Sequence, residues 1–264
     1  MTIEVPPRII KSQSDPAFDR DKFLLRQKHL AISEKYDVWD EEGNPILFVE
    51  RPAHLIRNVV AVLGGIVVGI VIAVLIALII PLVDEAWRAP PLLIFIGFLV
   101  DIAIIVVVAQ LLSKKRDINI YRDNSKTELL LTVRQDNKFE FINVTYTLQD
   151  QAGNTLAKFR KNYLYNIIRK RWYCYAPEGS MLAIAKEDSI ILSLLRRFLG
   201  TFFGLLRLNF IILKGTSDTI LGKFNRKFTL LDRYVLDMTA DKTREFDRQI
   251  AIALGILLDT GERR

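Results

Sequence analysis

The carboxyl-terminal run from Phe246 to Asp259 places the strongest constraint on the fold, because it has no polar face between Ile250 and Leu258. We expect a helix here that is buried on all sides. Its apolar stretch extends only about 13 Å at roughly 1.5 Å per residue, far short of a hydrocarbon core of about 30 Å. Protein must therefore surround this helix.

The rest of the chain repeats one pattern, which is a β-rich run, a turn with acidic residues and Gly, and a second apolar run. Gly supplies the positive φ of hairpin turns, and Asp or Asn hydrogen-bonds the local backbone. The turns fall at 40–45, 150–154, 177–180 and 215–218. Unrelated loops that share common turn residues are the alternative. The pattern predicts an antiparallel meander, and closing it into a barrel would provide a lumen for the helix.

Two long apolar stretches, Val59–Val83 and Leu92–Leu112, interrupt this pattern. A membrane-spanning helix needs about 20 mainly apolar residues, and both stretches meet that length. Basic residues flank the pair, with Arg57 before it and Lys114 after it, whereas the link 84–91 is partly acidic. The sequence therefore predicts a transmembrane hairpin of an integral membrane protein with two spans, whose termini and barrel are cytosolic.

Asp101 is the one charged residue inside these stretches. A carboxylate near the middle of a span costs about 2.5–3.5 kcal/mol, so we expect it to face protein or water. A role in ion or lipid passage and a structural polar clamp are both open interpretations. Small residues recur at every fourth position of the first stretch, where they permit close packing against the second stretch or against another copy. These helix-packing residues are Ala61, Gly65, Gly69, Ala73 and Ala77.

Composition argues against common catalytic chemistries. The 264 residues carry a formal charge of +7, and the only histidines are His29 and His54. Cys174 is the only cysteine, which suits a reducing compartment and a structural thiol better than a catalytic one. The sequence has neither a phosphate-binding Gly-rich loop nor a nucleophile elbow. We expect no enzyme activity, no cofactor and no metal site.

The sequence divides into four parts. Residues 1–19 are expected to be a flexible tail, 20–56 the first β-hairpin of the barrel, and 57–113 the transmembrane hairpin. Residues 114–264 complete the barrel and include the central helix at 245–259. They also include a segment at 189–208 that is amphipathic when read as a helix. This segment could lie in a lipid headgroup region, or its apolar face could cap the barrel.

Basic clusters next to the expected strands are the candidate lipid-binding sites. Near an anionic leaflet each Lys or Arg adds about 1 kcal/mol of attraction, so a few of them could hold the barrel against the surface. Solvated surface charge is the alternative interpretation. The candidates are Arg169, Lys170, Arg171, Arg196, Arg197, Arg207, Lys223, Arg226 and Lys227.

Several stretches together resemble the tubby C-terminal-like superfamily, in its LURP-one-related and phospholipid-scramblase-like branch. The similar residues lie at 23–28, 36–51, 150–154, 171–179, 221–227, 234–237, 247–248 and 257–259. The resemblance implies a closed antiparallel β-barrel around a carboxyl-terminal hydrophobic helix, here with the hairpin inserted after the first β-hairpin. Scramblases of this branch carry an acidic, calcium-associated segment before the final helix. Here Lys242 and Arg244 dilute the acids of that segment.

The resemblance implies binding or redistribution of lipid. We expect a membrane-anchored barrel that engages anionic phospholipids, with no nucleic acid as partner. Phospholipid scrambling or ion transport through a homo-oligomer of hairpins is one alternative. A membrane-tethered scaffold for protein partners is another.

Overall fold

The computed structural model is a mainly β protein, and it describes eleven segments of the chain. They are residues 15–28, 34–51, 60, 63–75, 91–112, 115, 117–137, 142–163, 170–188, 209–227 and 233–260. The chain divides into two compact units. Unit 1 comprises Met1–Pro52 and Arg116–Arg264, and unit 2 comprises Ala53–Lys115.

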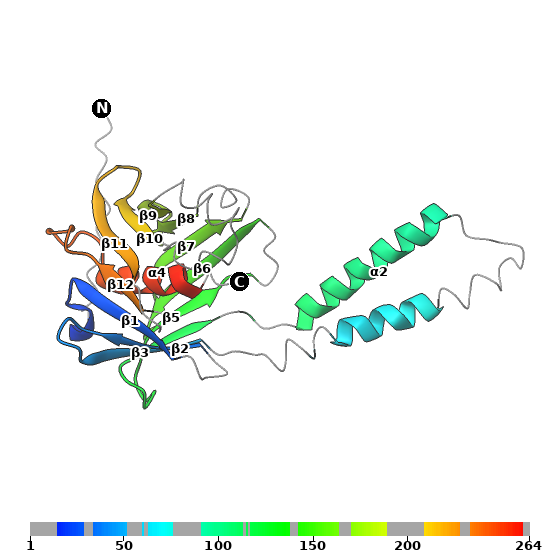
Figure 1. Cartoon of the computed structure of the whole chain (residues 1–264), viewed down its shortest axis with the longest axis horizontal. Helices are drawn as coiled ribbons and strands as arrows, with labels where there is room; N and C mark the ends of the chain where they lie inside the picture. Colours follow the sequence, from blue (N-terminus) through cyan, green and yellow to red (C-terminus); the bar gives the residue numbers. More distant parts are fainter. Residues whose placement is uncertain are drawn as a thin grey trace, which may run out of the picture. The chain divides into compact units, whose positions relative to one another are not determined.

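Twelve antiparallel strands form the closed barrel of unit 1 (Figure 1). Each strand pairs with the next along the chain, and β12 returns to pair with β1, so that no strand edge is left open. The strands are β1 Lys22–Lys28, β2 Glu34–Trp39, β3 Pro45–Arg51, β4 Ile118–Tyr121, β5 Leu129–Gln135, β6 Asn143–Asp150, β7 Thr155–Asn162, β8 Arg171–Tyr175, β9 Met181–Glu187, β10 Asn209–Lys214, β11 Ile220–Lys227 and β12 Arg233–Asp237. The predicted closed meander is confirmed.

The expected Asp/Gly turns join neighbouring strands. Asp40 and Asp150 each accept a hydrogen bond from the backbone N–H four residues later, at 2.6 Å from Asn44 and 2.8 Å from Asn154. Gly153 has a φ of 84°, a backbone conformation in which most residues other than Gly are strained. Because connections in a meander alternate between its two ends, all the short turns lie at one rim, which we call the turn rim. The longer connections leave from the other, the connection rim.

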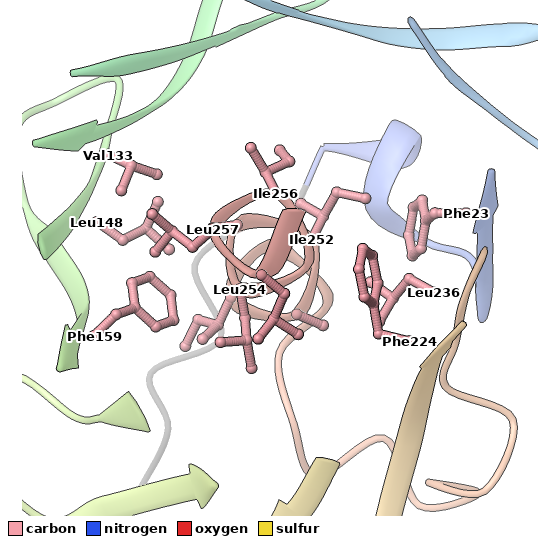
Figure 2. Close-up of a cluster of buried hydrophobic side chains, with 14 of the residues drawn as sticks. Phe23, Val133, Leu148, Phe159, Phe224, Leu236, Ile252, Leu254, Ile256 and Leu257 are labelled. Atoms are coloured by element: carbon pink, nitrogen blue, oxygen red, sulfur yellow. The ribbon is translucent and has the colours of Figure 1, made fainter. Parts of the chain in front are cut away.

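Helix α4, Arg248–Thr260, fills the barrel, and every one of its residues is buried. Figure 2 shows Leu257 directed toward Leu148 and Phe159 of β6 and β7. Phe23, Phe224 and Leu236 lie on the opposite side of the helix in the same view. Alternate residues of the twelve strands point inward, and the apolar helix packs against them on all sides. The predicted central helix is confirmed.

The amino-terminal end of the described chain also contributes to this core. Residues 16–18, which the sequence placed in a flexible tail, form the short 3-10 helix η1, Pro16–Phe18. The Asp15 side chain accepts the backbone N–H of Ala17 and caps η1. Phe18 is buried, and its contribution to the apolar core is the reason that this segment is ordered as it is.

The prediction of two membrane spans is overturned. Within the part of the chain that the structure describes, none of the helices offers enough apolar length to cross a membrane. The first apolar stretch is described as a helix over 63–75, and these residues extend about 20 Å against the roughly 30 Å needed. In helix α2, Pro91–Leu112, side chains are described over 97–108 and at 111. Asp101 is a charged residue within this otherwise apolar run. This correction covers Val59–Val83, Leu92–Leu112 and the integral membrane placement with cytosolic termini.

Candidate anion-binding surface

Five cations gather on the outward face of β7 to β11, which we call the basic wall. Antiparallel strands lie about 4.8 Å apart, so this wall is about 19 Å wide. The cations are Lys158, Arg160, Arg171, Lys186 and Lys223. Among the side chains described on these strands, the only carboxylate is that of Glu187, which is buried on the inner face. The outward positions of the basic wall therefore carry positive charge without acidic neighbours on the same strands.

Cations on the other side of the barrel are paired with carboxylates. Lys35 and Glu50 are register partners across β2 and β3, with 3.8 Å between Lys35 Nζ and Glu50 Oε1. Lys126 Nζ lies 2.6 Å from Glu50 Oε2, and Lys22 Nζ lies 3.1 Å from Glu41 Oε2. Within the described residues, no carboxylate forms an ion pair with Lys158 or Arg160. Lys158 and Arg160 therefore differ from these paired cations, whereas Lys186 of the basic wall has Asp218 Oδ1 at 3.6 Å.

Apolar and aromatic side chains lie between the cations of the basic wall. Arg160 is the register partner of Tyr173, and Lys158 is the partner of Tyr175. Ile184 and Ile211 occupy outward positions of β9 and β10 and are half-buried. Tyrosine and aliphatic residues mixed with cations are typical of surfaces that meet the headgroup region of a bilayer.

The predicted lipid-binding residues are only partly brought together. Arg171 and Lys223 are exposed on the basic wall, and Lys170 immediately precedes β8. Arg226 and Lys227 belong to the last residues of β11, at the connection rim. Arg169, Arg196, Arg197 and Arg207 lie outside the described residues, as does the segment 189–208. The sequence reasoning had not singled out Lys186, which the register places opposite Arg171.

Lys161, the residue after Arg160 on β7, points into the barrel. Its side chain is only 5% exposed, and Nζ lies 5.3 Å from the ring centroid of Trp172 and 5.4 Å from that of Tyr163. Alternation along β7 explains the difference, since Lys158 and Arg160 face outward and Lys161 faces inward. Lys161 therefore contributes to the interior and is absent from the basic wall.

In the acidic segment before α4, Arg248 pairs with the Asp241 carboxylate. Arg248 Nη1 donates to Asp241 Oδ2 at 2.7 Å, and Arg248 Nη2 donates to Asp21 Oδ1 at 2.7 Å. Asp241 also accepts the backbone N–H groups of Glu245 and Phe246, each at 3.0 Å. Over the described residues, no cluster of three His, Cys, Asp or Glu residues is arranged to hold a metal ion. The Asp241 carboxylate is thus engaged by a guanidinium and by backbone groups, and the Glu245 carboxylate is paired with Lys214.

Cys174 lies on the inner face of β8, and its thiol is fully buried. Burial raises the pKa of this thiol far above its ordinary value, because a thiolate would lose its solvation there. The nucleophilic form is therefore suppressed at neutral pH. This position supports the structural interpretation of the single cysteine.

In unit 2 the small residues mark a close helix contact. A Cβ added to Gly65 would lie 2.7 Å from the Ile105 carbonyl oxygen, and one added to Gly69 would lie 3.0 Å from Asp101 Oδ1. Gly65 and Gly69 thus pack against α2 of the same chain. Ala73 is exposed, whereas Ala61 and Ala77 lie outside the described residues. Packing through another copy of this segment stays a prediction.

Asp101 faces the same contact. Its Oδ1 is buried and has no hydrogen-bond partner among the described residues. The helices of unit 2 otherwise expose apolar side chains, among them Val67 at 60% and Phe98 at 60%. Asp101 therefore takes part in the packing between the two helices, which agrees with the interpretation that it faces protein.

The fold defines the class of this protein, a closed antiparallel barrel that encloses its own carboxyl-terminal helix. The family model described as LURP-one-related matches residues 104–259, more than half of the 264-residue chain. The chain belongs to the LURP-one-related family, whose barrels are related to the tubby-like ones. No curated protein matches the sequence closely enough to indicate a relationship. The phospholipid-scramblase-like branch stays a prediction.

Proposed function

We propose that this protein binds anionic phospholipid surfaces through the basic wall of its barrel. The observation that carries the proposal is the contrast between the two sides of the barrel. Lys158 and Arg160 have no carboxylate partner among the described residues, whereas Lys35 is paired with Glu50. An anionic surface would supply the missing negative charge.

The size of the effect follows from the charge. Each Lys or Arg near an anionic leaflet contributes about 1 kcal/mol, so five cations together are sufficient for reversible surface binding. The half-buried Tyr173 and Tyr175 between them favour a lipid interface over a purely ionic partner such as nucleic acid. The interaction is electrostatic and must weaken as salt screens it.

Charge reversal on the basic wall tests the proposal. Lys158→Glu should weaken binding of the full chain to vesicles of phosphatidylcholine with phosphatidylserine by about 30-fold, since reversing one charge changes the attraction by about 2 kcal/mol. Lys242→Glu is the matched control, because Lys242 is exposed beyond the turn rim, between β12 and α4. It should bind nearly as well as the wild-type chain.

The measurement is co-sedimentation over a salt series, expressed as the ratio of binding to anionic and to neutral vesicles. This ratio cancels any charge-independent association through the exposed apolar side chains of unit 2. Binding that ignores salt, or that falls equally in Lys158→Glu and Lys242→Glu, would contradict the proposal. In that case a protein partner becomes the leading alternative for this surface.

A further inference from the structure

Two cations of the basic wall each face a tyrosine on the neighbouring strand. Lys158 of β7 is the register partner of Tyr175 of β8. Arg160 is likewise the register partner of Tyr173. Both cations are exposed, and both tyrosines are half-buried on the outward face. Side chains directly opposite in an antiparallel pair have Cβ atoms about 4.5–5.5 Å apart. Each of these two tyrosine rows therefore brings a cationic donor close to a phenolic hydroxyl group.

The polar groups of the two tyrosine rows are not used within the protein. Among the residues that the structure describes, none forms a hydrogen bond or an ion pair with either cation or with either tyrosine hydroxyl. On the other side of Lys158, its register partner Thr147 donates its hydroxyl to Asp136 Oδ1 at 2.6 Å. The Asp136 carboxylate forms no ion pair with Lys158 in the described part of the chain. The cations and hydroxyls of the two rows are therefore available to a ligand from outside the protein.

The spacing of the rows and their apolar border indicate the kind of ligand. One two-residue repeat of the strands separates the rows, which is about 7 Å. On β9 the Lys158 row continues with Met181, the register partner of Tyr175. The Arg160 row continues with Ile184, the partner of Tyr173. Met181 and Ile184 are half-buried apolar side chains. Because lipid headgroups lie next to glycerol and acyl carbons, an apolar border beside anion-binding groups favours a lipid over inorganic phosphate or nucleic acid.

We infer that the two tyrosine rows bind a lipid that carries two phosphodiester groups, one in each row. In each row the cation donates to a phosphate oxygen and neutralises its charge, and the phenolic hydroxyl donates a second hydrogen bond. Cardiolipin presents two phosphodiesters joined by a three-carbon bridge, whereas phosphatidylglycerol presents one. Once one phosphate is bound, the other is held at a high effective concentration beside the second row. The inference deepens the proposed function and rests on it.

Co-sedimentation of the full chain with two kinds of vesicle tests the inference. Vesicles containing cardiolipin are compared with phosphatidylglycerol vesicles at equal phosphate charge and equal salt, and the result is the ratio of the two Kd values. The wild-type chain should bind the cardiolipin vesicles several-fold more tightly. Lys158→Met and Arg160→Met should each bring the ratio close to one, since either change leaves a single complete row. Lys223→Met, on the same wall but outside the rows, should weaken both interactions and keep the ratio.

Removal of a single hydroxyl tests the role of the tyrosines without removing a ring. Tyr173→Phe and Tyr175→Phe should each lower the ratio toward one, because an anionic phosphate oxygen loses a donor. Tyr121→Phe, on β4 and outside the basic wall, is the matched control and should keep the wild-type ratio. Thermal unfolding and near-ultraviolet circular dichroism should show that all of these variants are folded.

The possible outcomes separate this inference from the proposed function. Equal binding of the wild-type chain to the two kinds of vesicle would overturn the inference, and so would a preference that survives in both Lys158→Met and Arg160→Met. The proposed function stands in either case if binding is salt-sensitive and Lys158→Glu weakens it. Absence of binding to any anionic vesicle would overturn both. A short single-stranded oligonucleotide that binds more tightly than cardiolipin vesicles, with the same dependence on the two rows, would overturn the assignment to lipid.

Discussion

Arg248 shows how one residue fixes several parts of the chain to one another. Its guanidinium is only 6% exposed and contacts Asp21 before β1, Asp241 after β12 and the Phe246 carbonyl before α4. A buried guanidinium is costly unless its donors find acceptors, and here the neighbouring carboxylates provide them. The beginning of α4 is thereby tied to both strands that close the barrel.

The Asp241 carboxyl makes this arrangement sensitive to pH. Burial alone would raise the pKa of Asp241, but hydrogen bonds from Arg248 and from the N–H groups of Phe246 and Glu245 bring that pKa below its ordinary value. An aspartate with a lowered folded-state pKa stabilises the protein fully above its unfolded pKa of about 3.9. The stabilisation is lost as the pH falls through the lowered pKa of the folded state.

Asp241→Asn should therefore lower the free energy of unfolding at pH 7 by about 3–5 kcal/mol, because it leaves Arg248 with one charged partner fewer in a buried site. The difference from the wild-type chain should shrink as the pH falls from about 4 towards 2. Urea unfolding across this range measures both effects. A difference that stays constant from neutral to acidic pH would show that the Asp241 charge is not responsible.

At the scale of elements, α4 illustrates where sequence reasoning succeeds. The run from Ile250 to Leu258 offers no polar face, so a helix there has to be enclosed, and α4 is enclosed by the barrel. The turns at Asp40 and Asp150 were equally predictable, since a short Asx side chain and a following Gly encode them locally. Local chemistry therefore specified both the central helix and the meander.

The candidate site was harder to predict because it depends on strand register. Near the turn, Tyr175 pairs with Met181, but an irregularity after Cys174 shifts the rest of β8 and β9 by one residue. Continued without this shift, the turn would have placed Arg171 opposite Ala185. A one-residue shift changes the face of every side chain, and the local sequence gives no sign of it.

The two apolar stretches led to a wrong prediction of membrane spans for another reason. Hydropathy counts apolar residues, but it does not show that Asp101 packs against Gly69 of the other helix.

Leu257→Ala tests the dependence of the barrel on α4. The substitution should lower the free energy of unfolding by about 2–5 kcal/mol, because Leu257 is fully buried and the space that it leaves cannot be refilled by rigid strands. Ile220→Ala is the control, since Ile220 on β11 is 41% exposed and should cost much less. Urea unfolding compares the two, and equal losses would mean that the interior does not depend on this contact.

At the scale of the whole molecule, unit 2 interrupts a pair of adjacent strands. β3 ends at Arg51 and β4 begins at Ile118, yet Glu50 and Asn119 are register partners. The two points where the chain leaves and re-enters the barrel are therefore about 5 Å apart. Such an arrangement makes unit 2 an insertion into a hairpin that is complete without it.

Replacing residues 53–115 with a short Gly/Ser linker should leave the barrel folded. We expect a Tm within a few degrees of the value for the barrel in the full chain, because the linker closes a shorter loop between strands that already pair. Near-ultraviolet circular dichroism and thermal unfolding measure this outcome. A shortened chain that lacks fixed aromatic signals would show that the barrel requires unit 2.

The pairing of β1 with β12 has a consequence for how the chain is made. A ribosome releases Phe23 long before Leu236, its partner in the sheet. The barrel cannot close, and its lumen cannot be filled by α4, until residues 233–260 have emerged. Until then a growing sheet would expose an inner apolar face and two unpaired edges, which is the state that molecular chaperones bind. From this topology we expect that chaperones assist the chain during translation.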